Sequence, residues 1–564
     1  MDGVRPMSLP YEPFEDRLPP APLPYSVARE LLWQLLASLS LGLGAWYIGW
    51  RWSGSLNQDA LWLSIPLAAA ETCAYIGVAL FTFNLWRDES PKGPASPPRQ
   101  LSECVAAGER PLRVDVFFPT AGEDLELVRL SLRDAKQLRY PCPIDIRIHV
   151  LDDGRRADIR QLAADEGVRY ITRKNNADRK AGNLRNAMEK SDGDFVVLCD
   201  AGTRLFPRFL EHTLGYFRER DMAWVQTPQW FFDLPAGDPF GNDPQMLYDV
   251  VLRRRNQANA AYCCGAASVH RREAVMQAAL KGWVLQVDAE LHRVTAKAGA
   301  EPDDGLEETM RRQIALDTEL TPYRLHVAQD VYTSIVLHSD PDRRWKSVLH
   351  PWVQSKMLSS HGLQARLTQR FKHTAGILDI CLHENPLFRR GLDWRQKLMY
   401  AATFWPCFGG LWNLVFLCAP IIYLFTGIAP VASYSFDFFK HALPFLIAHE
   451  LALMAGTWGV VSFKAKRSSL AFFAVDLRAL WTVLRGAAIE PPGIPGERRS
   501  GTFYRLVWPQ VLLIVLTLAG LLVQGGLLLS RRGDLGAYMA NFSWGLYNIY
   551  MLSGLVRAAG RTAE

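Results

Sequence analysis

Two clusters of long apolar segments enclose a polar block, and this arrangement restricts the chain to a membrane protein with one large domain outside the lipid. The first cluster consists of residues 31–50 and 61–83, and the second of residues 403–425, 443–461, 506–529 and 536–555. Each segment is long enough to cross a bilayer as a helix. The sequence therefore predicts six spans, with the polar block between the second and the third.

These segments divide the chain into four parts. We expect a polar, Pro-rich segment over residues 1–26, two membrane helices over 27–86, an α/β domain over 87–391, and interfacial helices with about four spans over 392–564. The first part lacks a charged tip followed directly by an apolar core, so it is no cleavable signal peptide. The first span should therefore remain in the protein.

Composition argues against nucleic acid and zinc. The net charge of +6 is small for 564 residues, and Lys and Arg do not alternate with aromatic residues as they do in nucleic-acid binders. The nine cysteines contain no two CxxC motifs at zinc spacing, and Cys263 and Cys264 are adjacent. We therefore expect no nucleic-acid partner, no structural zinc and a reducing cytosol around the polar domain.

The distribution of basic residues predicts the orientation. The loop after the fourth span is rich in Lys and Arg between residues 464 and 499, which places it in the cytoplasm. With six spans, both termini and the polar domain then lie on the cytoplasmic side of the membrane. Arg531 and Arg532 would face outward and oppose this orientation.

Two further segments mix apolar and charged residues at helical spacing. Residues 392–404 and 469–489 are expected to lie on the cytoplasmic face of the membrane rather than to cross it. For the second segment, a seventh span interrupted by Asp476 and Arg478 stays open. Glu71 and Glu450 fall inside predicted spans, so they should face the bundle interior or a polar channel.

The polar block alternates strand and helix patterns from residue 113 to residue 205. Such alternation predicts an α/β domain with a mostly parallel sheet, in which ligands bind beyond the carboxyl ends of the strands. Carboxylates occur at these ends: Asp152 and Asp153 end one buried strand, Asp200 ends another, and Glu123 follows a third. The sequence therefore predicts a ligand site at this edge of the sheet.

An ordered series of motifs extends over nearly the whole chain. It comprises PTAGE (119–123), VLDDGRR (150–156), RKAGNLRNAM (179–188), LCDAGTRLFPRFL (198–210), VQTPQWF (225–231), CCGAASVHRR (263–272), AQDVYTSIVLHSD (328–340) and TQRFKHTAG (368–376). In this order the motifs resemble those of the membrane-embedded family 2 glycosyltransferases, bacterial cellulose synthases above all. The resemblance implies a GT-A-like cytoplasmic domain joined to a helical transmembrane bundle.

The resemblance also implies roles for individual residues. The donor, a UDP-sugar, would be bound by Thr120, Glu123, Asp152, Asp153, Lys180 and Asp200. Because a diphosphate leaving group needs positive charge beside it, Lys180 and a Mg²⁺ or Mn²⁺ ion on Asp200 suit this chemistry. Asp330 would be the general base, taking the proton of the attacking hydroxyl in a single inverting displacement. The growing polysaccharide would be bound by Cys264, Gly265, Gln369, Arg370, Lys372 and His373.

The chain departs from the family pattern in three places. Gly202 replaces the second carboxylate of the usual Asp–x–Asp metal motif, which should weaken metal binding. The acceptor motif ends in Lys372 and His373 instead of Arg and Trp; Lys lacks the planar fork of Arg, and His is a smaller platform for a sugar ring. The segment that the family uses for gating reads EPPGIPGERRSG at residues 490–501.

Three functions remain open at this point. The leading hypothesis is a processive enzyme that polymerises a UDP-hexose, most simply UDP-glucose, into a β-linked exopolysaccharide and translocates it across the inner membrane. The second is a catalytically degraded homologue that binds a polysaccharide or a synthase, and the third is a transferase of one sugar to a lipid carrier. A periplasmic or membrane partner subunit is left open, and we expect no regulatory domain after the last span. A polar stretch, residues 286–321, is interpreted as a solvated helical insertion, with a partner-binding element as the alternative.

Overall fold

The strand and helix patterns between residues 112 and 198 produce the parallel half of a seven-stranded sheet in the computed structural model of the chain. Parallel strands β3, β2, β1 and β4 lie side by side in that order. Their bounds are β1 Leu112–Thr120, β2 Ile144–Asp152, β3 Arg169–Ile171 and β4 Phe195–Leu198, with connecting helices α3 Leu125–Lys136, α4 Ala157–Asp165 and α5 Arg179–Glu189. The structure describes residues 11–560 except 106–107, 177–178, 235–243, 299–303, 319, 322, 324–325, 360–361, 459, 461, 490–502 and 531–534.

The other half of the sheet is mixed. Strand β7 pairs antiparallel with both β4 and β6, and β8 pairs parallel with β6. Strands β6 Met222–Gln226, β7 Ser268–Arg271 and β8 Lys346–Leu349 complete this sheet, while β5 Arg204–Leu205 and β9 Ser355–Lys356 form a separate antiparallel pair. The predicted α/β domain with a mostly parallel sheet is thereby confirmed.

Strand β1 is buried on both faces, as expected for a central parallel strand. Val114, Val116 and Phe118 pack into the core beneath α3 and α4, while Phe117 faces the opposite way into the cluster around α5. All four side chains are fully buried. This two-sided packing fixes the position of the residues that follow Thr120.

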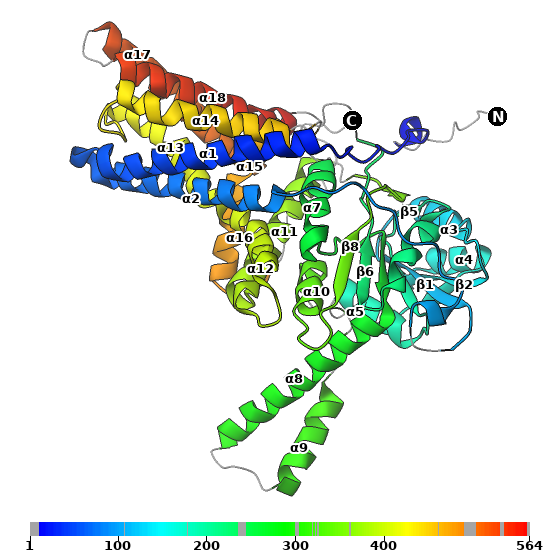
Figure 1. Ribbon diagram of the computed structural model, residues 1–564. Coiled ribbons are helices and arrows are strands. Elements are labelled where there is room, and N and C mark those ends of the chain that lie inside the picture. Colours follow the sequence, from blue (N-terminus) through cyan, green and yellow to red (C-terminus); the bar gives the residue numbers. More distant parts are fainter. Residues whose placement is uncertain are drawn as a thin grey trace, which may run out of the picture.

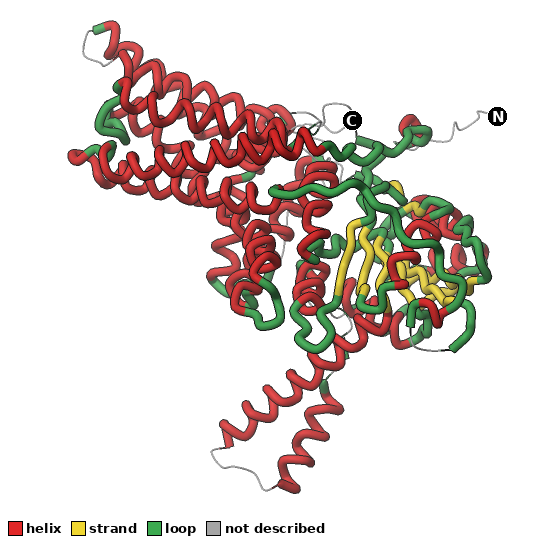
Figure 2. Tube along the Cα trace, in the orientation of Figure 1, coloured by secondary structure: helices red, strands yellow, loops and turns green. Residues whose placement is uncertain are grey.

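The helical bundle lies at one side of the sheet domain (Figures 1 and 2). Its long helices are α1 Val27–Gly54, α2 Leu61–Leu85, α13 Gly409–Thr426, α14 Phe436–Gly456, α17 Trp508–Leu529 and α18 Leu535–Ala559. Among the described residues, five stretches are long and apolar enough to cross a membrane, and α18 is not one of them. The predicted sixth span is therefore a helix in the bundle, and the count of six stays a prediction.

Both segments predicted to lie at the membrane surface are helical. The first is α12, Trp394–Phe404, which leads through a turn at residues 405–408 into α13; Figure 1 shows α12 below the bundle and α13 within it. The second is divided into α15, Ser462–Ala471, and α16, Phe473–Leu484. Helix α16 packs against α11, Leu363–His383. The predicted gating segment at 490–501 lies outside the described residues, as do Arg531 and Arg532.

The two acidic residues inside the spans are both paired. Arg51 Nε lies 2.7 Å from Glu71 Oε2, and its Nη1 donates to Ser55 Oγ at 2.6 Å. Glu450 forms an ion pair with Lys466 of α15. Because an isolated charge in the bilayer is costly, these pairs explain how the bundle accommodates the carboxylates.

The N-terminal segment lies against the sheet domain, which the sequence did not predict. Glu15 forms ion pairs with Arg204 and Lys356, both at 2.6 Å. Arg17 donates to the carbonyl oxygens of Phe232 and Leu234. The segment before the first span therefore fastens the domain to the bundle.

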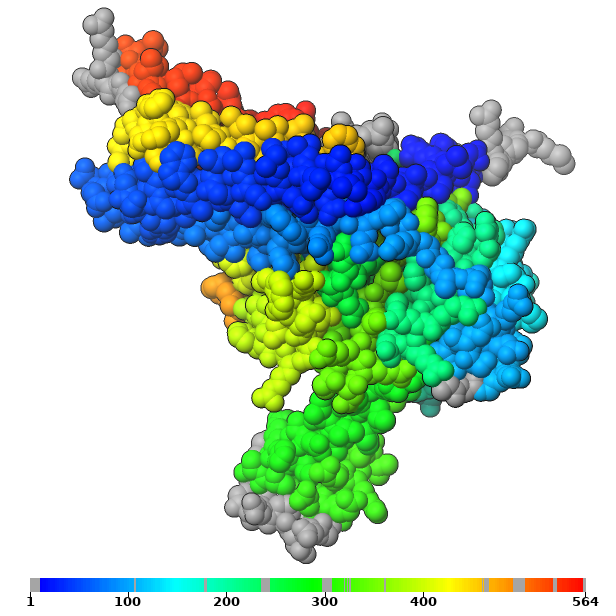
Figure 3. Space-filling view, viewed as in Figure 1, coloured from blue at the N-terminus to red at the C-terminus, as the bar shows by residue number. Residues whose placement is uncertain are grey.

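The polar insertion forms a helical hairpin. Helices α8 Arg272–Ala298 and α9 Asp304–Asp317 extend away from the sheet domain, and Figure 3 shows them as a protruding arm. An ion pair between Arg311 and Asp288, at 2.7 Å, joins the two helices. The remaining helical elements include α6 Phe209–Thr213, the π-helix Met246–Leu252, α7 Arg253–Arg255 and α10 Gln329–His338.

Candidate active site

The predicted ligand residues gather at the carboxyl edge of the sheet. Thr120 and Asp152 are register partners at the ends of β1 and β2, and the Asp153 amide donates to the Thr120 carbonyl at 2.9 Å. Asp200 follows the next strand, β4. The parallel half of the sheet therefore brings these polar groups to one edge, as the sequence predicted.

The loop after β1 is organised by Glu123. Its Oε2 accepts hydrogen bonds from the Thr120 hydroxyl at 2.7 Å and from the backbone N–H groups of Ala121 and Gly122. Burial opposes ionisation of this carboxyl, but these donors outweigh it and lower the pKa of Glu123. Arg156 also donates to Thr120 Oγ1, at 3.1 Å. Glu123 is thus a charged side chain whose hydrogen bonds fix the conformation of the loop.

Asp152 and Asp153 are engaged with their own surroundings. Asp152 is fully buried and accepts hydrogen bonds from the backbone N–H groups of Gly154 and Arg156 and from the Tyr170 hydroxyl. Both Asp153 oxygens lie 2.7 Å from Arg173, from Nε and Nη2. These contacts shape the loop beside Thr120, and direct binding of the donor by either carboxylate stays a prediction.

Lys180 and Asp200 form an ion pair at the same edge. Lys180 Nζ lies 2.6 Å from Asp200 Oδ1, and the Asp200 amide donates to Thr203 Oγ1 at 2.8 Å. Burial disfavours the ammonium, but the carboxylates of Asp200 and Asp330 prevail and raise the pKa of Lys180. The pair therefore supplies one permanent positive charge and one exposed carboxylate.

The metal-ligand set at Asp200 is small. Within the described residues, no group of three or more His, Cys, Asp or Glu side chains could hold a metal ion. A Cβ on Gly202 would lie 3.1 Å from the Leu127 side chain, so a second carboxylate here would press against α3. Such a site fits Mg²⁺ or Mn²⁺ only where one carboxylate and the phosphates of a nucleotide share the ion.

Asp330 lies against Gly265, from a different part of the chain. Asp330 is the second residue of α10, and a Cβ added at Gly265 would lie 2.7 Å from its Oδ2. Burial raises the pKa of Asp330, and together with the negative charge of Asp200 it outweighs the Lys180 charge, which lowers this pKa. Asp330 is thus a carboxylate with a raised pKa that lies against the backbone of a glycine. A raised pKa is a property expected of a general base for a substrate hydroxyl.

A turn at residues 262–267 presents Gly265 to Asp330. The Cys264 amide donates to Gln226 Oε1 at 2.8 Å, and the Cys263 amide donates to Ser334 Oγ at 2.9 Å. Gln229 Nε2 donates to the Cys264 carbonyl at 3.2 Å. No role was predicted from the sequence for Gln226 or Gln229. Both lie in the VQTPQWF motif, and that motif could have identified them as residues of the site.

The predicted acceptor residues on α11 do not all face one way. Arg370 makes two hydrogen bonds to Asp476 of α16, at 2.9 and 2.8 Å, and Thr374 adds a third at 3.0 Å. Asp476 is only 1% exposed. Gln369 and His373 are exposed, and Lys372 is half-buried. Arg370 therefore joins α11 to α16, which the motif alone did not indicate.

His373 is exposed, although the chain around it partly desolvates its ring. This desolvation, followed by the charges of Arg370 and Arg366, lowers the pKa of His373 to about 4. The imidazole is consequently neutral at physiological pH, where it can offer a flat, uncharged ring. Gly376 brings α11 close to Ala328, where a Cβ on the glycine would lie 3.0 Å from the alanine Cβ. Helix α11 thus connects Asp330 with the bundle.

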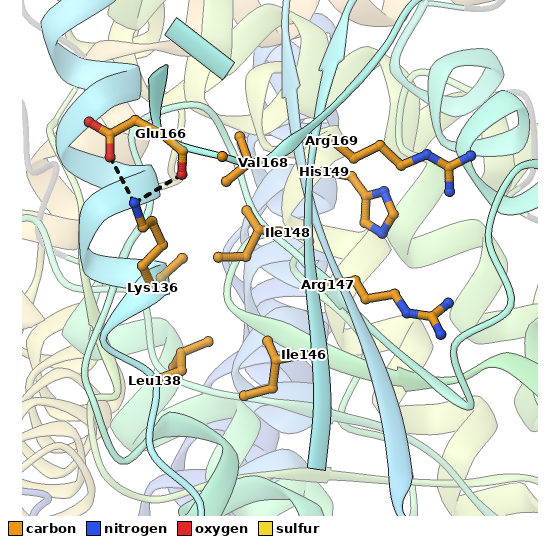
Figure 4. A pocket seen from close by; sticks show the side chains of 11 residues that line it. Lys136, Leu138, Ile146, Arg147, Ile148, His149, Glu166, Val168 and Arg169 are labelled. Atoms are coloured by element: carbon orange, nitrogen blue, oxygen red, sulfur yellow. Dashed lines mark hydrogen bonds and ion pairs between the residues drawn. The ribbon is translucent and has the colours of Figure 1, made fainter. Parts of the chain in front are cut away.

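A cavity of about 500 Å³ on the outer side of the sheet is separate from this site. Figure 4 shows Ile146, Ile148 and Val168 on its wall, with Lys136 bonded to Glu166 opposite. These residues lie along β2 and before β3 rather than beyond the strand ends. None of the predicted site residues lines this cavity.

Solved structures resemble the chain at low identity. A mannosyltransferase from Pyrobaculum calidifontis, in complex with GDP-Man and Mn²⁺, aligns over 74% of this chain and 99% of its own, with 14% identity and a TM-score of 0.46. Glucosyl-3-phosphoglycerate synthase from Mycobacterium tuberculosis, in complex with Mn²⁺, UDP-Glc and phosphoglyceric acid, aligns over 29% of this chain and 58% of its own, with 17% identity and a TM-score of 0.21.

Curated relatives are more similar in sequence. Residues 115–278 match the glycosyl transferase family 2 model. The cellulose synthase catalytic subunit (UDP-forming) of Pseudomonas fluorescens is 30% identical over 349 residues, which are 60% of this chain and 41% of that protein. Cellulose synthase 2 of Novacetimonas hansenii is 26% identical over 509 residues, 87% of this chain and 28% of that protein. The chain thus spans less than half of either relative, and its likeness to them is that of a divergent, cellulose synthase-like glycosyltransferase.

Proposed function

We propose that the chain polymerises a UDP-hexose, most simply UDP-glucose, into a β-linked exopolysaccharide and passes the product across the inner membrane, with residues 87–391 in the cytoplasm. The observation that carries this proposal is the contact between Asp330 and Gly265, with the Lys180–Asp200 pair near the same carboxylate. This arrangement supports a role for Asp330 as the base, with the positive charge of Lys180 nearby.

The residues suit an inverting displacement. Asp330 accepts the proton of the acceptor hydroxyl, whose oxygen forms a bond to the anomeric carbon while the bond from that carbon to the diphosphate oxygen breaks. Lys180 stabilises the negative charge that develops on the departing UDP. A divalent cation bound by Asp200 would neutralise the same diphosphate. Gly265 lets the backbone approach the carboxylate, beside which the acceptor ring would bind.

The connection to the bundle supports processive transfer. Helix α11 packs against α16 through the Arg370–Asp476 pair, and its Gly376 lies against the residue that precedes α10. Helix α11 thus links the proposed base to α16. Two curated relatives are named cellulose synthase catalytic subunits that form UDP. These names support a UDP-sugar as the donor and a glucan as the product.

A donor screen tests the proposal. The purified, detergent-solubilised chain is incubated with each radiolabelled UDP-hexose, with Mg²⁺, Mn²⁺ or EDTA, and UDP release and high-molecular-weight product are measured together. We expect metal-dependent polymer from one donor. Absence of UDP release from every donor, in protein that retains its normal melting temperature, would refute the proposal.

One observation favours a second candidate, a catalytically degraded homologue that binds a polysaccharide or a synthase partner. Gly202 removes one metal ligand, and Lys180 already occupies one oxygen of Asp200. Such a protein would bind glucan without metal-dependent donor binding. A transferase of one sugar to a lipid carrier would instead release UDP and give only a lipid-extractable product.

A further inference from the structure

A second cavity of about 500 Å³ lies where the bundle meets the sheet domain, away from the proposed active site. It is bounded by the carboxyl end of α2, by α7 and by the start of α12, and α2 contacts both of the other helices (Figure 1). Trp86 and Trp394 line it and are 39% and 61% exposed. Since exposed tryptophans favour the level of the lipid headgroups, the cavity lies at the membrane surface.

One wall of the cavity is basic. Arg87, Arg254 and Arg395 all line it. Arg87 and Arg395 are exposed, and within the described residues neither forms an ion pair with a carboxylate; Arg395 only approaches the Trp394 ring, at 5.5 Å. The cavity therefore carries two accessible positive charges that no protein carboxylate neutralises.

Arg254 adds a buried guanidinium with unused donors. It is 7% exposed, and its Nε and Nη1 have no hydrogen-bond acceptor in the described part of the chain. Its ion-pair partner, Asp88, lies 3.6 Å from Nη2. The Asp88 carboxylate also forms ion pairs with Arg29, at 3.5 Å, and with Arg253, at 3.2 Å. A buried guanidinium that shares one carboxylate with two others favours a further anion beside it.

Part of the remaining wall is apolar and extends toward the bundle, while Thr82, Asn84 and Gln257 add polar groups. Leu41 of α1, together with Ala79 and Phe83 of α2, lines the cavity, and Met399 of α12 closes it on the domain side. Ala79 lies one helical turn before Phe83, farther from the basic end of α2. An occupant must therefore combine an anionic group with a hydrocarbon portion.

We propose that this cavity binds one anionic phospholipid of the inner leaflet. Its phosphate lies between Arg87, Arg254 and Arg395, which suit phosphate because a guanidinium presents several N–H donors in one plane. Its acyl chain follows Leu41, Ala79 and Phe83 between α1 and α2. The lipid thus fills the joint between the bundle and the sheet domain, and this assignment is independent of the proposed glycosyl transfer.

The two exposed arginines allow a test without disturbing the fold. Delipidated full-length protein in detergent is mixed with phosphatidylglycerol, phosphatidylcholine or inorganic phosphate, and bound molecules are counted by native mass spectrometry. We expect phosphatidylglycerol to be retained in preference to phosphatidylcholine, and inorganic phosphate not to displace it. Each substitution, Arg87→Gln or Arg395→Gln, should weaken retention roughly fivefold, the effect of one basic side chain near an anionic membrane surface.

Arg390→Gln is the matched control. Arg390 is also exposed and precedes α12, but it does not line the cavity, so retention should be unchanged. Arg254→Gln should weaken retention further, and its melting temperature is measured alongside because the residue is buried. Equal retention of the two lipids, wild-type retention by the Arg87→Gln/Arg395→Gln double variant, or displacement by inorganic phosphate would each overturn the proposal.

Discussion

Gly265 contacts the Asp330 carboxylate so closely that a single added carbon, the Cβ of any other residue, would lie 2.7 Å from Oδ2. Gly265 also has a φ of 92°, in the region that favours glycine. The two residues are 65 positions apart in the sequence, and the contact exists because the 262–267 turn is hydrogen-bonded to β6 and to α10. The glycine thus allows the backbone of this turn to lie directly against the carboxylate.

Substitution of Gly265 by Ala should therefore abolish transfer. The methyl group would displace the Asp330 carboxylate or occupy the acceptor position, so we expect a loss of kcat/KM of at least about 100-fold, the scale of a misplaced catalytic group. Gly49→Ala is the control, because no atom lies within 4 Å of its added Cβ and its φ is not positive. Comparable activity of Gly265→Ala and wild type would show that the contact has no catalytic consequence.

The pH profile should report Asp330. A general base works when ionised, so activity should rise as pH increases through its pKa, and that pKa is raised by burial. The acidic limb of kcat/KM should accordingly lie above the ordinary value for Asp of about 4. Because the Lys180 charge lowers this pKa, Lys180→Gln should move the limb to higher pH. A limb that stays in place in Lys180→Gln would contradict the assignment.

The raised pKa of Asp330 also affects the stability of the folded protein. A carboxyl whose folded-state pKa is raised stabilises the fold when protonated, below the unfolded pKa, and that contribution is lost as pH increases through the folded pKa. At pH 7 the ionised Asp330 should therefore cost stability. We expect Asp330→Asn to melt at a higher temperature than wild type at pH 7, and the difference to shrink toward pH 4. A lower melting temperature at pH 7 would argue for a structural carboxylate.

Metal affinity should respond to position 202. An Asp there adds a second carboxylate beside Asp200 once Leu127 yields by a few tenths of an ångström. We expect Gly202→Asp to bind Mn²⁺ in the presence of UDP roughly tenfold more tightly, since ligand charge sets the affinity of such sites. Gly202→Asn has the same size without the charge and should not. Equal affinity of both variants, by titration calorimetry, would exclude position 202 from the metal site.

The Arg370–Asp476 pair should hold the fold rather than bind sugar. Removing one partner leaves the other charge buried, which costs about 3–5 kcal/mol in comparable pairs. Arg370→Leu should thus lower the melting temperature strongly, whereas Lys372→Leu, two residues away, should not. The double variant Arg370→Leu/Asp476→Leu should recover part of the loss. If Arg370→Leu keeps its melting temperature and instead raises KM, the acceptor role implied by the motif is right.

The sequence predicted the parallel half of the sheet because its strands and helices alternate along the chain. Asp152, Asp153 and Asp200 could be placed at one edge without coordinates, since carboxyl ends of parallel strands meet. The pairing of β7 between β4 and β6 could not, because long-range antiparallel pairing has no local signal. The fold class was correct, while the count of six spans stays a prediction, because five stretches of the described residues are long and apolar enough to cross a membrane and α18 is not one of them.

The candidate site was harder to predict than the fold. The motif series identified Asp330 and Gly265 separately, but their contact depends on the turn held by Gln226 and Ser334. Arg370 was expected to face the acceptor, and its orientation toward Asp476 follows from the packing of two helices about a hundred residues apart. The attachment of Glu15 to Arg204 and Lys356 likewise has no local pattern.

The most direct test of the account measures incorporation of radiolabel from UDP-glucose into polymer by wild type, Asp330→Asn and Asp330→Glu, each confirmed as folded by its melting temperature. We predict polymer from wild type, none from Asp330→Asn, and a reduced but measurable amount from Asp330→Glu, which keeps a carboxylate at a displaced position. Polymer synthesis by Asp330→Asn at the wild-type rate would contradict the assignment of Asp330 as the base.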